Sequence, residues 1–599
     1  MSTKRAHLLK SPKSTELPTR LLFYDTETNM EHISDNETKH TLKLGWICYW
    51  QRKRAKQPEK IVWHTFTTVE EFWDILLSYA KPKIRLLVIA HNQTFDAAIV
   101  DAYNQLPKLG YECKRLYDKK PVYIALYEKE TSRLLFLDNA NYHKSSLKEL
   151  GNQVGLEKLE VEFDTCTNEE LSIYCKRDVE ILYETWRKWF VFHLANDLGP
   201  FAVTIAGQAF ATYRHRFMHH EIYIHDRAWA YDLERQSYFG GRTECFYLGK
   251  IETGPITVVD VNSMYPAVMY TFDYPCKLVN RLRQISAYQL EDILKTYLVV
   301  AQVRLNTLEP VFPLRYNERL CFPIGSFQTC LATPEIAYAL QHDYIQEVGD
   351  VIVYEGAPLF RDFVTFFWQE RSKAKLIDDK AGALFYKLLL NSLYGKFGQK
   401  MEGWEIIGKA KEGQSGYWRD FDMDTMKWHS FRAVLDVVQE MKRYEEAYHS
   451  FPAVASHVTS WARQYLWELM LIAGRDNVYY CDTDSLFINN VGASNLESMH
   501  NNTQLGMLSN KGIYNRVEIK GPKSYTLDDK TTLKGIRKNA IQIAPNKYKQ
   551  QQWPSLSSLI RDGLDKGYVV RDIIKTLNNT YTKGEVLESG KIIPYLLPR

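Results

Sequence analysis

The sequence has no run of 18 or more apolar residues, so no segment is long enough to cross a membrane as a helix. It also lacks a secretory signal, because the first apolar pair, Leu8-Leu9, is far too short. The nine cysteines contain no CxxC pair, which argues against a structural zinc site and against a disulfide framework. We therefore expect an intracellular protein with reduced thiols and no contact with a membrane.

The chain also has little net charge, +4 from 76 Lys and Arg against 72 Asp and Glu. The charge is uneven: residues 1–20 carry +4 and residues 531–599 carry +7, which leaves −7 for residues 21–530. This distribution fits a polyanionic partner at one end and metals in the middle, although solvated charged faces would give the same balance. Residues 1–20 are polar and basic without apolar periodicity, so we predict a disordered tail there. The remaining length suggests several domains.

Two aspartates, Asp482 and Asp484, lie between two short apolar segments. Residues 478–480 and 486–488 are β-branched, aromatic or aliphatic, which predicts two strands joined by a turn. Side chains two apart in an extended chain project to one side, so both carboxylates would share one face of the hairpin tip. Two anions that close favour a divalent metal between them. A tight turn with aspartates chosen for turn chemistry remains an alternative.

A second group of acids lies within the first 180 residues, where two strands and a helix are predicted. The strands are Leu21–Tyr24 and Leu86–Ala90, and the helix includes residues 171–179. Four acids and one tyrosine lie on these elements or follow them: Asp25, Glu27, Asp96, Asp178 and Tyr174. Four carboxylates could hold two metals about 4 Å apart, and Tyr174 could orient a water for hydrolysis. Each acid taken singly would more simply be a cap or a surface residue.

A third acidic position is Asp260, which ends an apolar strand that begins at Thr257. Asn262 or Ser263 would cap the helix that follows, with Pro266 in its first turn. The free backbone amides at this helix start could face a triphosphate. Tyr265 would lie beneath an incoming sugar and leave no room for a 2′-hydroxyl. A strand–helix junction with a structural aspartate would explain this segment equally well.

Two helices with lysines follow further along the chain. Lys387, Asn391 and Tyr394 are spaced i, i+4 and i+7, which places them on one stripe of a helix. A preceding helix at about 363–376 carries Lys375. An antiparallel pair with lysines on both arms would suit a triphosphate, with Tyr394 as a platform for a base.

Together these motifs resemble those of family B DNA polymerases. The patterns DxE, NxxFD and YxxxD, in this order, resemble the three motifs of a DEDDy 3′–5′ exonuclease domain. DxxSMYP at 260–266, KLLLNSLYG at 387–395 and YCDTDS at 480–485 resemble polymerase motifs A, B and C. No long domain precedes the exonuclease motifs and the chain is compact. These features fit the protein-primed branch found in small phages, related viruses and linear plasmids.

The resemblance implies an α/β multidomain fold, with an RNase H-like exonuclease domain and a right-hand polymerase that carries two insertion subdomains. The expected order is a disordered tail (1–20), exonuclease (21–200), first palm part with motif A (201–275), first insertion (276–360), fingers (361–398), second insertion (399–450), second palm part with motif C (451–530) and thumb (531–599). The first insertion would contact a terminal protein. The second would support processivity and strand displacement, although its Trp-rich strands suggest more than a compact hairpin. It would lie between motif B and a strand at residues 459–463, which match a further family element.

The resemblance also implies roles for individual residues. Asp260 and Asp484 would ligate two Mg²⁺ ions together with the Val261 carbonyl, and Asp482 would support them. The expected exonuclease residues are Asp25, Glu27, Asp96 and Asp178 as metal ligands, with Tyr174. The expected nucleotide-binding residues are Val261, Tyr265, Lys375, Lys387, Asn391 and Tyr394. The expected DNA-binding residues are Thr28, Asn92, Phe95, Ser146 (with Ser145 as a competing choice), Leu147, Tyr238, Gly240, Gly241, Arg463, Lys523 and Tyr525.

The implied function is protein-primed, strand-displacing DNA synthesis with 3′–5′ proofreading on a linear viral or plasmid genome. A primer-independent primase-polymerase of the same branch, or a non-catalytic DNA-binding scaffold, is the alternative. The cofactor would be Mg²⁺, two ions per active site, with Mn²⁺ as a substitute. The partners would be template and primer DNA, dNTPs and a terminal protein, bound by a monomer or in a 1:1 heterodimer. The location would be the host-cell cytoplasm or nucleoid.

Overall fold

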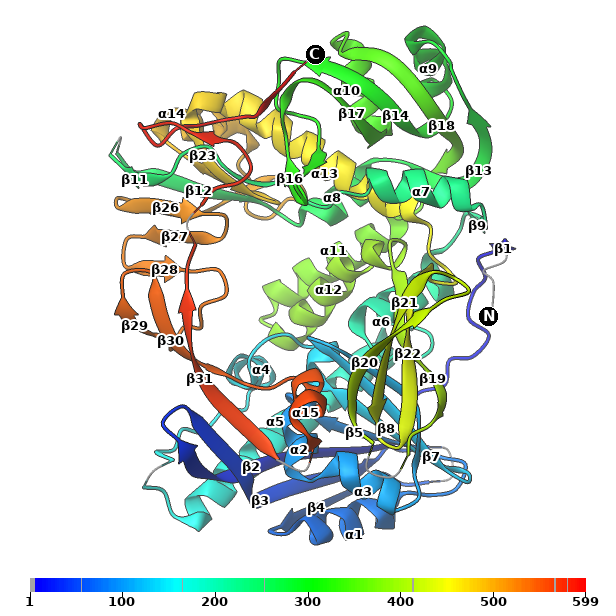
Figure 1. Cartoon of the computed structure of the whole chain (residues 1–599), viewed down its shortest axis with the longest axis vertical. Helices are drawn as coiled ribbons and strands as arrows, with labels where there is room; N and C mark the ends of the chain where they lie inside the picture. The colour runs from blue at the N-terminus through cyan, green and yellow to red at the C-terminus, as the bar shows by residue number, and fades with distance from the viewer. Residues whose placement is uncertain are drawn as a thin grey trace.

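The computed structural model describes residues 6–54, 57–163, 165–252, 254–411, 414–564, 567–578 and 580–598, without the side chains of residues 401, 402 and 443–445. Within this part of the chain, no helix combines the length and the apolar character that a membrane span requires. Figure 1 shows one sheet at the bottom, built mainly from the first residues of the chain, and two further sheets at the top. A pair of helices lies between them.

The lower sheet has ten strands, and its centre is parallel. β2 pairs in parallel with β5, and β5 with β8. In spatial order the strands are β29 (Ile541–Ala544), β30 (Lys547–Gln552), β31 (Tyr568–Thr576), β3 (Glu37–Gln51), β2 (Arg20–Ser34), β5 (Arg85–Ala90), β8 (Ser132–Asp138), β7 (Val122–Lys129) and β6 (Glu112–Lys119), with β4 (Lys60–Phe66) also paired to β3.

Helices cover both faces of this sheet, which explains the continuous apolar run in β2. Leu21 and Phe23 lie in the same core cluster as residues of α5 (Asn168–Ala195), whereas Leu22 and Tyr24 lie in a second cluster with residues of α1 (Val69–Tyr79). Because successive side chains of a strand point to opposite faces, a strand covered on both sides must be apolar at every position. The helix predicted around 171–179 and the strand predicted at 86–90 are both confirmed.

The upper sheet that carries Asp260 and Asp482 is antiparallel. In spatial order its strands are β10 (Thr243–Cys245), β23 (Val478–Asp482), β24 (Ser485–Ile488), β12 (Ile256–Val261) and β25 (Leu508–Tyr514). The hairpin predicted at 478–488 is therefore confirmed. The strand register sets both Asp260 and Asp482 opposite Ser485, so strand pairing brings residues more than 200 positions apart to one end of the sheet.

The two helices in the middle of Figure 1 are α11 (Arg361–Leu376) and α12 (Lys380–Ser392), which pack against each other. The helix predicted at 363–376 is thus confirmed to within two residues. The Asp379 side chain accepts a hydrogen bond of 2.9 Å from the Gly382 amide and caps the start of α12. A short helix, α6 (Ile205–Thr212), packs against α12.

Two sheets lie within the predicted insertions. In the first, β13 (Tyr274–Leu282), β18 (Ile345–Ala357), β14 (Leu298–Thr307) and β17 (Ile324–Ala332) form one sheet, and the C-terminal β34 (Leu596–Leu597) joins its edge. In the second, the order is β19 (Lys400–Lys409), β22 (Val437–Glu446), β21 (Lys427–Val434) and β20 (Gly416–Asp422). The second unit is a four-stranded sheet, which accounts for the length that its sequence suggested.

The structure corrects three expectations. The disordered tail is wrong for residues 6–20, because His7-Leu8 pair with Tyr223-Ile224 and Leu9 is only 2% exposed; residues 1–5 lie outside the described part. Residues 459–463, expected as a strand, lie inside α13 (Pro452–Ala473). Residues 531–599, expected as a thumb, do not form a unit of their own: β31 pairs with β3 of the lower sheet, and β34 pairs with β17 in the sheet of the first insertion. Residues 565, 566, 579 and 599 of that range lie outside the described part.

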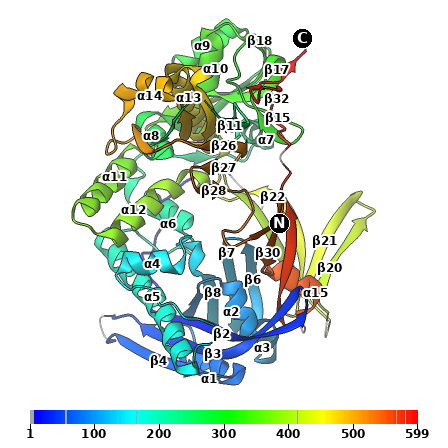
Figure 2. The same cartoon turned by 90° about the vertical axis from the view of Figure 1, so that its left-hand side faces the viewer.

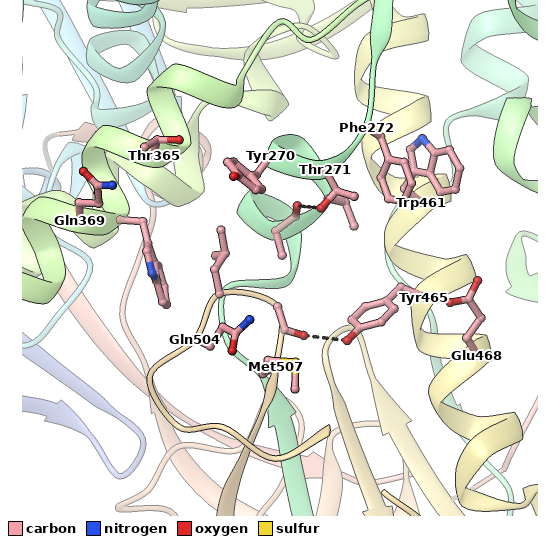
Figure 3. Close-up of a pocket in the computed structure, with 15 residues that line it drawn as sticks. Tyr270, Thr271, Phe272, Thr365, Gln369, Trp461, Tyr465, Glu468, Gln504 and Met507 are labelled. Carbon is pink, nitrogen blue, oxygen red and sulfur yellow. Dashed lines mark hydrogen bonds between the residues drawn. The ribbon is translucent and has the colours of Figure 1, made fainter. Parts of the chain in front are cut away.

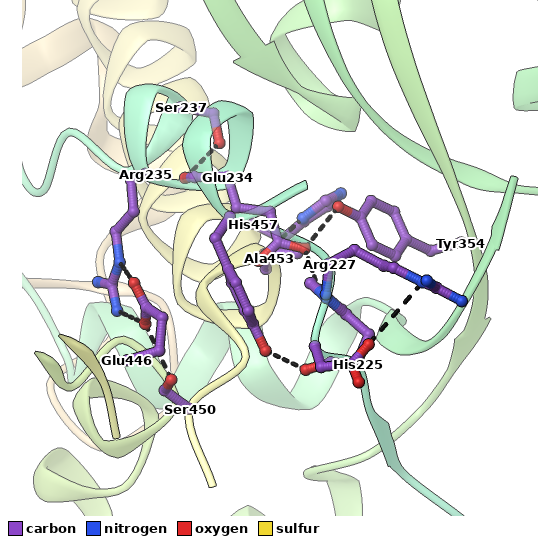
Figure 4. Close-up of polar contacts among 12 residues, drawn as sticks. His225, Arg227, Glu234, Arg235, Ser237, Tyr354, Glu446, Ser450, Ala453 and His457 are labelled. Atoms are coloured by element: carbon purple, nitrogen blue, oxygen red, sulfur yellow. Dashed lines mark hydrogen bonds and ion pairs between the residues drawn. The ribbon is translucent and has the colours of Figure 1, made fainter. Parts of the chain in front are cut away.

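A polar network fixes α7 (Ala228–Ser237) between the two insertions (Figure 4). The buried Glu234 carboxylate accepts a hydrogen bond of 2.7 Å from the Tyr354 hydroxyl of β18 and lies 2.8 Å from the His225 ring. On the opposite side of α7, Arg235 donates to Glu446 of β22 at 2.8 Å and to the Gly398 carbonyl at 2.7 Å. Because α7 leads directly into Tyr238–Gly241, these contacts set the position of that turn.

The N-terminal segment yields a first prediction. Replacing Leu9 with Ala removes a buried side chain and should cost about 2 kcal/mol of stability, because the neighbouring strands cannot close the cavity. The expected result is a lower melting temperature and faster proteolysis within residues 10–20. Lys13→Ala, at an exposed position nearby, is the matched control and should leave both measurements unchanged. Equal behaviour of the two variants would contradict the docking of this segment.

Candidate functional site

The four acids predicted near the N-terminus converge at one edge of the lower sheet; they are referred to below as the N-terminal acidic cluster (Asp25, Glu27, Asp96 and Asp178). Carboxylate oxygens of Asp25 and Glu27 lie within 4.8 Å of each other and of the Cys175 sulfur. Asp96 is 2% exposed, and its Oδ1 accepts hydrogen bonds from the Thr26 amide (3.1 Å) and hydroxyl (2.7 Å). We expected β2 to end at these acids. Instead it continues beyond them, as one arm of a hairpin, to Ser34.

Burial raises the pKa values of all four acids, and repulsion by neighbouring acids adds to this for Asp25, Glu27 and Asp96. Burial is the largest cause for Asp25, whose pKa is further raised by the charges of Asp96, Asp178 and Glu27. Burial raises the pKa of Glu27 to about 7 and that of Asp96 to about 8. Burial also raises the pKa of Asp178, against the lowering effect of Lys158. Without a cation between them, these groups cannot all be ionised near neutral pH.

The donor atoms of the cluster fit a hard divalent cation. Carboxylate oxygens are the ligands that Mg²⁺ and Mn²⁺ prefer, and four converging carboxylates can hold two ions. The neighbouring Cys175 does not compete, because burial raises its pKa well above its ordinary value. The neutral thiol instead contacts Asp25 Oδ2 at 3.6 Å as a weak donor.

One member of this site, Lys158, was not predicted from the sequence. Its ammonium group forms an ion pair with Asp178 and lies 4.2 Å from the centre of the Tyr174 ring. Lys158 therefore holds together the two α5 side chains that were predicted to share a helix face. It lies in the segment after α4 (Leu147–Val154), outside every motif that we identified, so its sequence context gave no signal.

Residues predicted to hold a single strand lie around the cluster, with differing exposure. Asn92 is exposed in a left-handed conformation, and the Thr28 hydroxyl lies 2.8 Å from His40 Nδ1. Phe95 packs edge-on against Tyr568, with ring centroids 5.0 Å apart. Ser146 caps α4 through a capping box, and Leu147 is only 8% exposed within the core. The structure thus gives Ser146 a capping role and turns Leu147 inward.

The second acidic site is formed by Asp260 and Asp484, referred to below as the central acidic pair. The Val261 amide donates a hydrogen bond of 2.7 Å to the Asp484 carbonyl, which fixes the hairpin turn against the end of β12. Burial, followed by the charges of Asp260 and Asp482, raises the pKa of Asp484 to about 6. Asp482 is held differently, because its carboxylate accepts from Thr243 Oγ1 at 2.9 Å and pairs with Lys523 Nζ at 3.3 Å. This arrangement suits the supporting role predicted for Asp482, while two facing carboxylates again fit divalent cations.

Four cations face the central acidic pair. Lys511 Nζ lies 3.3 Å from Asp260 Oδ1, and Arg371 donates to the Ser263 hydroxyl at 3.3 Å. Burial and the charges of Arg371, Lys387 and Lys511 lower the pKa of Lys375, which shows that these side chains converge from α11, α12 and β25. Arg371 and Lys511 belong to no motif that we identified, so only the tertiary structure assigns them to the site.

Aromatic rings and a close backbone approach complete this site. The rings of Tyr265 and Tyr394 are 4.6 Å apart, and Asn391 is exposed on the same helix as Lys387. A Cβ on Gly241 would lie 2.9 Å from the Thr483 side chain, so only glycine allows the 238–241 turn to reach the hairpin tip.

One predicted DNA contact is wrong. Arg463 is 3% exposed and pairs with the fully buried Glu335 at 2.8 Å. It also donates to the Gly240 carbonyl, so it positions the turn next to the hairpin tip instead of facing DNA. By contrast, the Lys523 side chain is exposed beside Asp482, and Tyr525 packs against Tyr480 and Phe487 below it.

A cavity of about 620 Å³ lies behind α8 (Met264–Thr271) (Figure 3). Trp461 stacks on Phe272 at its upper wall, and the Tyr465 hydroxyl donates to the Gly506 carbonyl at 2.8 Å. The Gly506 amide in turn donates to the Asn262 carbonyl at 3.0 Å. The cavity wall therefore supports the turn after Asp260.

Comparisons with known proteins show the family and the fold of the chain. A family model described as DNA polymerase type B, organellar and viral, matches residues 111–496, more than half of the chain. A protein of Neurospora intermedia named probable DNA polymerase is 26% identical over 380 residues, which cover 59% of this chain and 37% of that protein. The DNA-directed DNA polymerase of Enterobacteria phage PRD1 is 30% identical over 299 residues, covering 49% of this chain and 50% of that protein. The matched regions thus span half or less of these relatives.

The fold resembles that of a solved structure, Phi29 DNA polymerase complexed with primer-template DNA. The TM-score is 0.68 at 16% identity, and the match covers 94% of this chain and 100% of the other. A structure of the same enzyme complexed with single-stranded DNA matches with a TM-score of 0.66. The predicted multidomain α/β fold is therefore confirmed.

The raised pKa values predict how divalent cations affect stability. The carboxyl groups of Glu27 and Asp96 titrate higher in the folded protein than in the unfolded chain, so the stability they contribute is present in acid and lost as the pH rises through about 7 and 8. In EDTA the melting temperature should therefore fall between about pH 5 and pH 8, and Mg²⁺ should reverse most of this fall. Thermal unfolding followed by tryptophan fluorescence measures both effects.

Two variants calibrate this experiment. In EDTA, the melting temperature of Glu27→Gln should depend less on pH than that of the wild type, because an amide cannot ionise. Glu291→Gln, at an exposed position, should keep the wild-type pH dependence. A melting temperature in EDTA that rises over this pH range would contradict the assigned pKa directions.

Proposed function

Because this chain belongs to the organellar and viral type B DNA polymerases, we propose that it is a DNA-directed DNA polymerase with a 3′–5′ exonuclease that proofreads its product. The observation that carries the proposal is the central acidic pair facing the cations of α11, α12 and β25 across one site. An acidic pair for cations opposite a cationic wall for phosphates is what nucleotidyl transfer from a triphosphate requires. The relatives named as DNA polymerases support it.

In this proposal each part of the site binds one part of the substrates. Asp260 and Asp484, with the Val261 carbonyl, hold Mg²⁺ or Mn²⁺, which lower the pKa of the attacking hydroxyl and stabilise the leaving oxygen when bound. Lys375, Lys387 and Lys511 bind the triphosphate, and Tyr265 and Tyr394 pack against the sugar and base. Lys523 binds the primer strand next to Asp482, where its exposed ammonium group already lies.

The N-terminal acidic cluster forms a separate hydrolytic site. Its carboxylates would hold two divalent cations, whose contribution when bound would be to lower the pKa of a water next to the terminal phosphodiester. Tyr174 lies beside Asp178, and Lys158 is well placed to balance negative charge that develops on the phosphate. Asn92 and Phe95 hold the unpaired 3′ end, where the face of an aromatic ring can stack on a base.

Replication of a linear genome from a terminal protein is the remaining part of the proposal. The motifs and the two insertions support it: the 276–360 unit folds as a sheet of its own beside the synthesis site, a position suited to a priming partner. The second unit projects beside the lower sheet, where Lys409 Nζ lies 3.4 Å from Glu112 of β6. This position suits strand separation ahead of the synthesis site.

Two variants should separate the activities. Asp260→Ala should reduce primer extension at least 1,000-fold, on the order expected when a metal ligand is lost, and spare degradation of single-stranded DNA. Asp25→Ala combined with Asp96→Ala should do the reverse. Gel analysis of a labelled primer, with and without dNTPs, measures both. Asp292→Ala, an exposed site on the first insertion, is the control. Loss of both activities in either variant would contradict two independent sites.

Protein priming has its own test. Purified protein is incubated with Mg²⁺, labelled dATP and linear genome ends, with and without the candidate terminal protein encoded beside it. Label that becomes covalently attached to the terminal protein is the expected result. Extension of a DNA primer without any labelled protein would leave the polymerase assignment intact and remove the protein-primed one.

A further inference from the structure

The cavity behind α8 differs in chemistry from the two acidic sites. It holds about 620 Å³. Among the described residues that line it, Glu468 is the one charged side chain, and none is Lys, Arg or His. Five aromatic rings line it, those of Tyr270, Phe272, Trp368, Trp461 and Tyr465. A cavity of this size, lined by rings and a single charge, has the character of a small-molecule site.

The Glu468 carboxylate has no cation against it in the part of the chain that the structure describes. Burial raises the pKa of Glu468, and no neighbouring positive charge counteracts the increase. Burial, followed by the charge of Glu468, raises the pKa of Tyr465. Figure 3 shows these two side chains together at one wall of the cavity. A partly buried anion without a counter-ion favours a ligand that carries a positive charge.

The aromatic rings favour the same kind of ligand. The face of an aromatic ring carries partial negative charge and attracts a cation, most strongly when the ring is that of Trp. Trp461 stacks on Phe272 with ring centroids 3.5 Å apart, which fixes both rings in the wall. A ligand with an aromatic body would bury apolar surface here, and an ammonium group on it would balance Glu468. A phosphate or a carboxylate would meet no cation among the described lining residues.

The cavity lies between elements that carry the central acidic pair and its cations. In both Figure 1 and Figure 2, α8 lies between α13 and α11, and it packs against both helices. Trp368 lines the cavity from α11, and one turn further along this helix Arg371 donates to the Ser263 hydroxyl at 3.3 Å. On the other wall, hydrogen bonds through Gly506 link α13 to the turn after β12. A molecule in the cavity would therefore touch both sides of the central site.

We propose that this cavity binds an aromatic organic cation, and that its occupant weakens the binding of a triphosphate at the central acidic pair. The aromatic part of the ligand packs against the rings, and its ammonium group pairs with Glu468. The occupant lies between α11 and α8, so it opposes a closer approach of the α11 cations to Asp260 and Asp484. The binding site is independent of the proposed function, whereas the effect on triphosphate binding rests on it.

Three probes with one ring system and different charges test the binding site. 1-Naphthylmethylammonium, 1-naphthalenemethanol and 1-naphthoate are titrated into the protein, and ligand-observed NMR measures each Kd. Mg²⁺ is present throughout and keeps the ammonium probe from the acidic sites. The cation should bind with a Kd of about 1 mM or lower. Its affinity should be about fivefold higher than that of the alcohol, and the anion should bind least.

Two variants locate the bound probe. Glu468→Gln should remove the preference for the cation over the alcohol, whereas Glu291→Gln, an exposed acid on the first insertion, is the matched control and should keep it. Thr365→Trp adds a ring inside the cavity from α11, so it should weaken the binding of both probes. Circular dichroism checks that this variant is folded. Equal affinities for the cation and the anion, or binding that neither variant alters, would overturn the proposed site.

The coupling to the central site has a separate measurement. Saturating dATP with Mg²⁺ should raise the Kd of the ammonium probe about fivefold, because coupling between two binding sites is reciprocal. The probe should also raise the KM for dATP in the extension of a primer by one nucleotide. If primers are extended but neither value changes, the coupling is overturned. If the wild type does not extend primers, the proposed function fails, while the probe titrations still decide the binding site.

Discussion

Repulsion between buried carboxylates is the interaction on which both acidic sites depend. In each site the fold brings acids together at the end of a sheet, where their charges oppose one another and burial opposes ionisation. The protein places a lysine against three of the acids: Lys158 beside Asp178, Lys511 beside Asp260 and Lys523 beside Asp482. These lysines reduce the repulsion between the acids.

Strand pairing over long sequence separations holds the two sites in place. β12 pairs with β24 and β25, which brings Asp260 to the tip of the 478–488 hairpin. In the lower sheet, β31 pairs with β3, so the C-terminal part of the chain closes over the residues near Phe95. The resulting contact between Phe95 and Tyr568 joins the N-terminal and C-terminal parts of the chain beside the N-terminal acidic cluster. Local propensity cannot specify such pairings, because each depends on elements formed hundreds of residues away.

Charged residues that serve structure and charged residues that serve function look alike in the sequence. Arg463 and Lys523 were both expected to contact DNA, yet Arg463 is buried against Glu335 while Lys523 is exposed beside Asp482. A buried arginine must have a partner, and that partner lies in a helix 128 positions earlier. The strand expected at 459–463 failed for a related reason. α13 is buried along most of its surface, so it lacks the polar stripe that identifies a surface helix.

The sequence by itself determined the acidic motifs, the 478–488 hairpin, the helix pair of α11 and α12 and the family resemblance, because spacing along one strand or helix fixes which side chains share a face. The tertiary structure alone decided which cations meet those acids, that residues 6–20 are docked and that the C-terminal residues are divided among several sheets. These outcomes depend on burial and on pairing between distant segments. A lysine outside any motif, such as Lys158 or Lys511, acquires its role only when folding sets it within a few ångströms of a carboxylate.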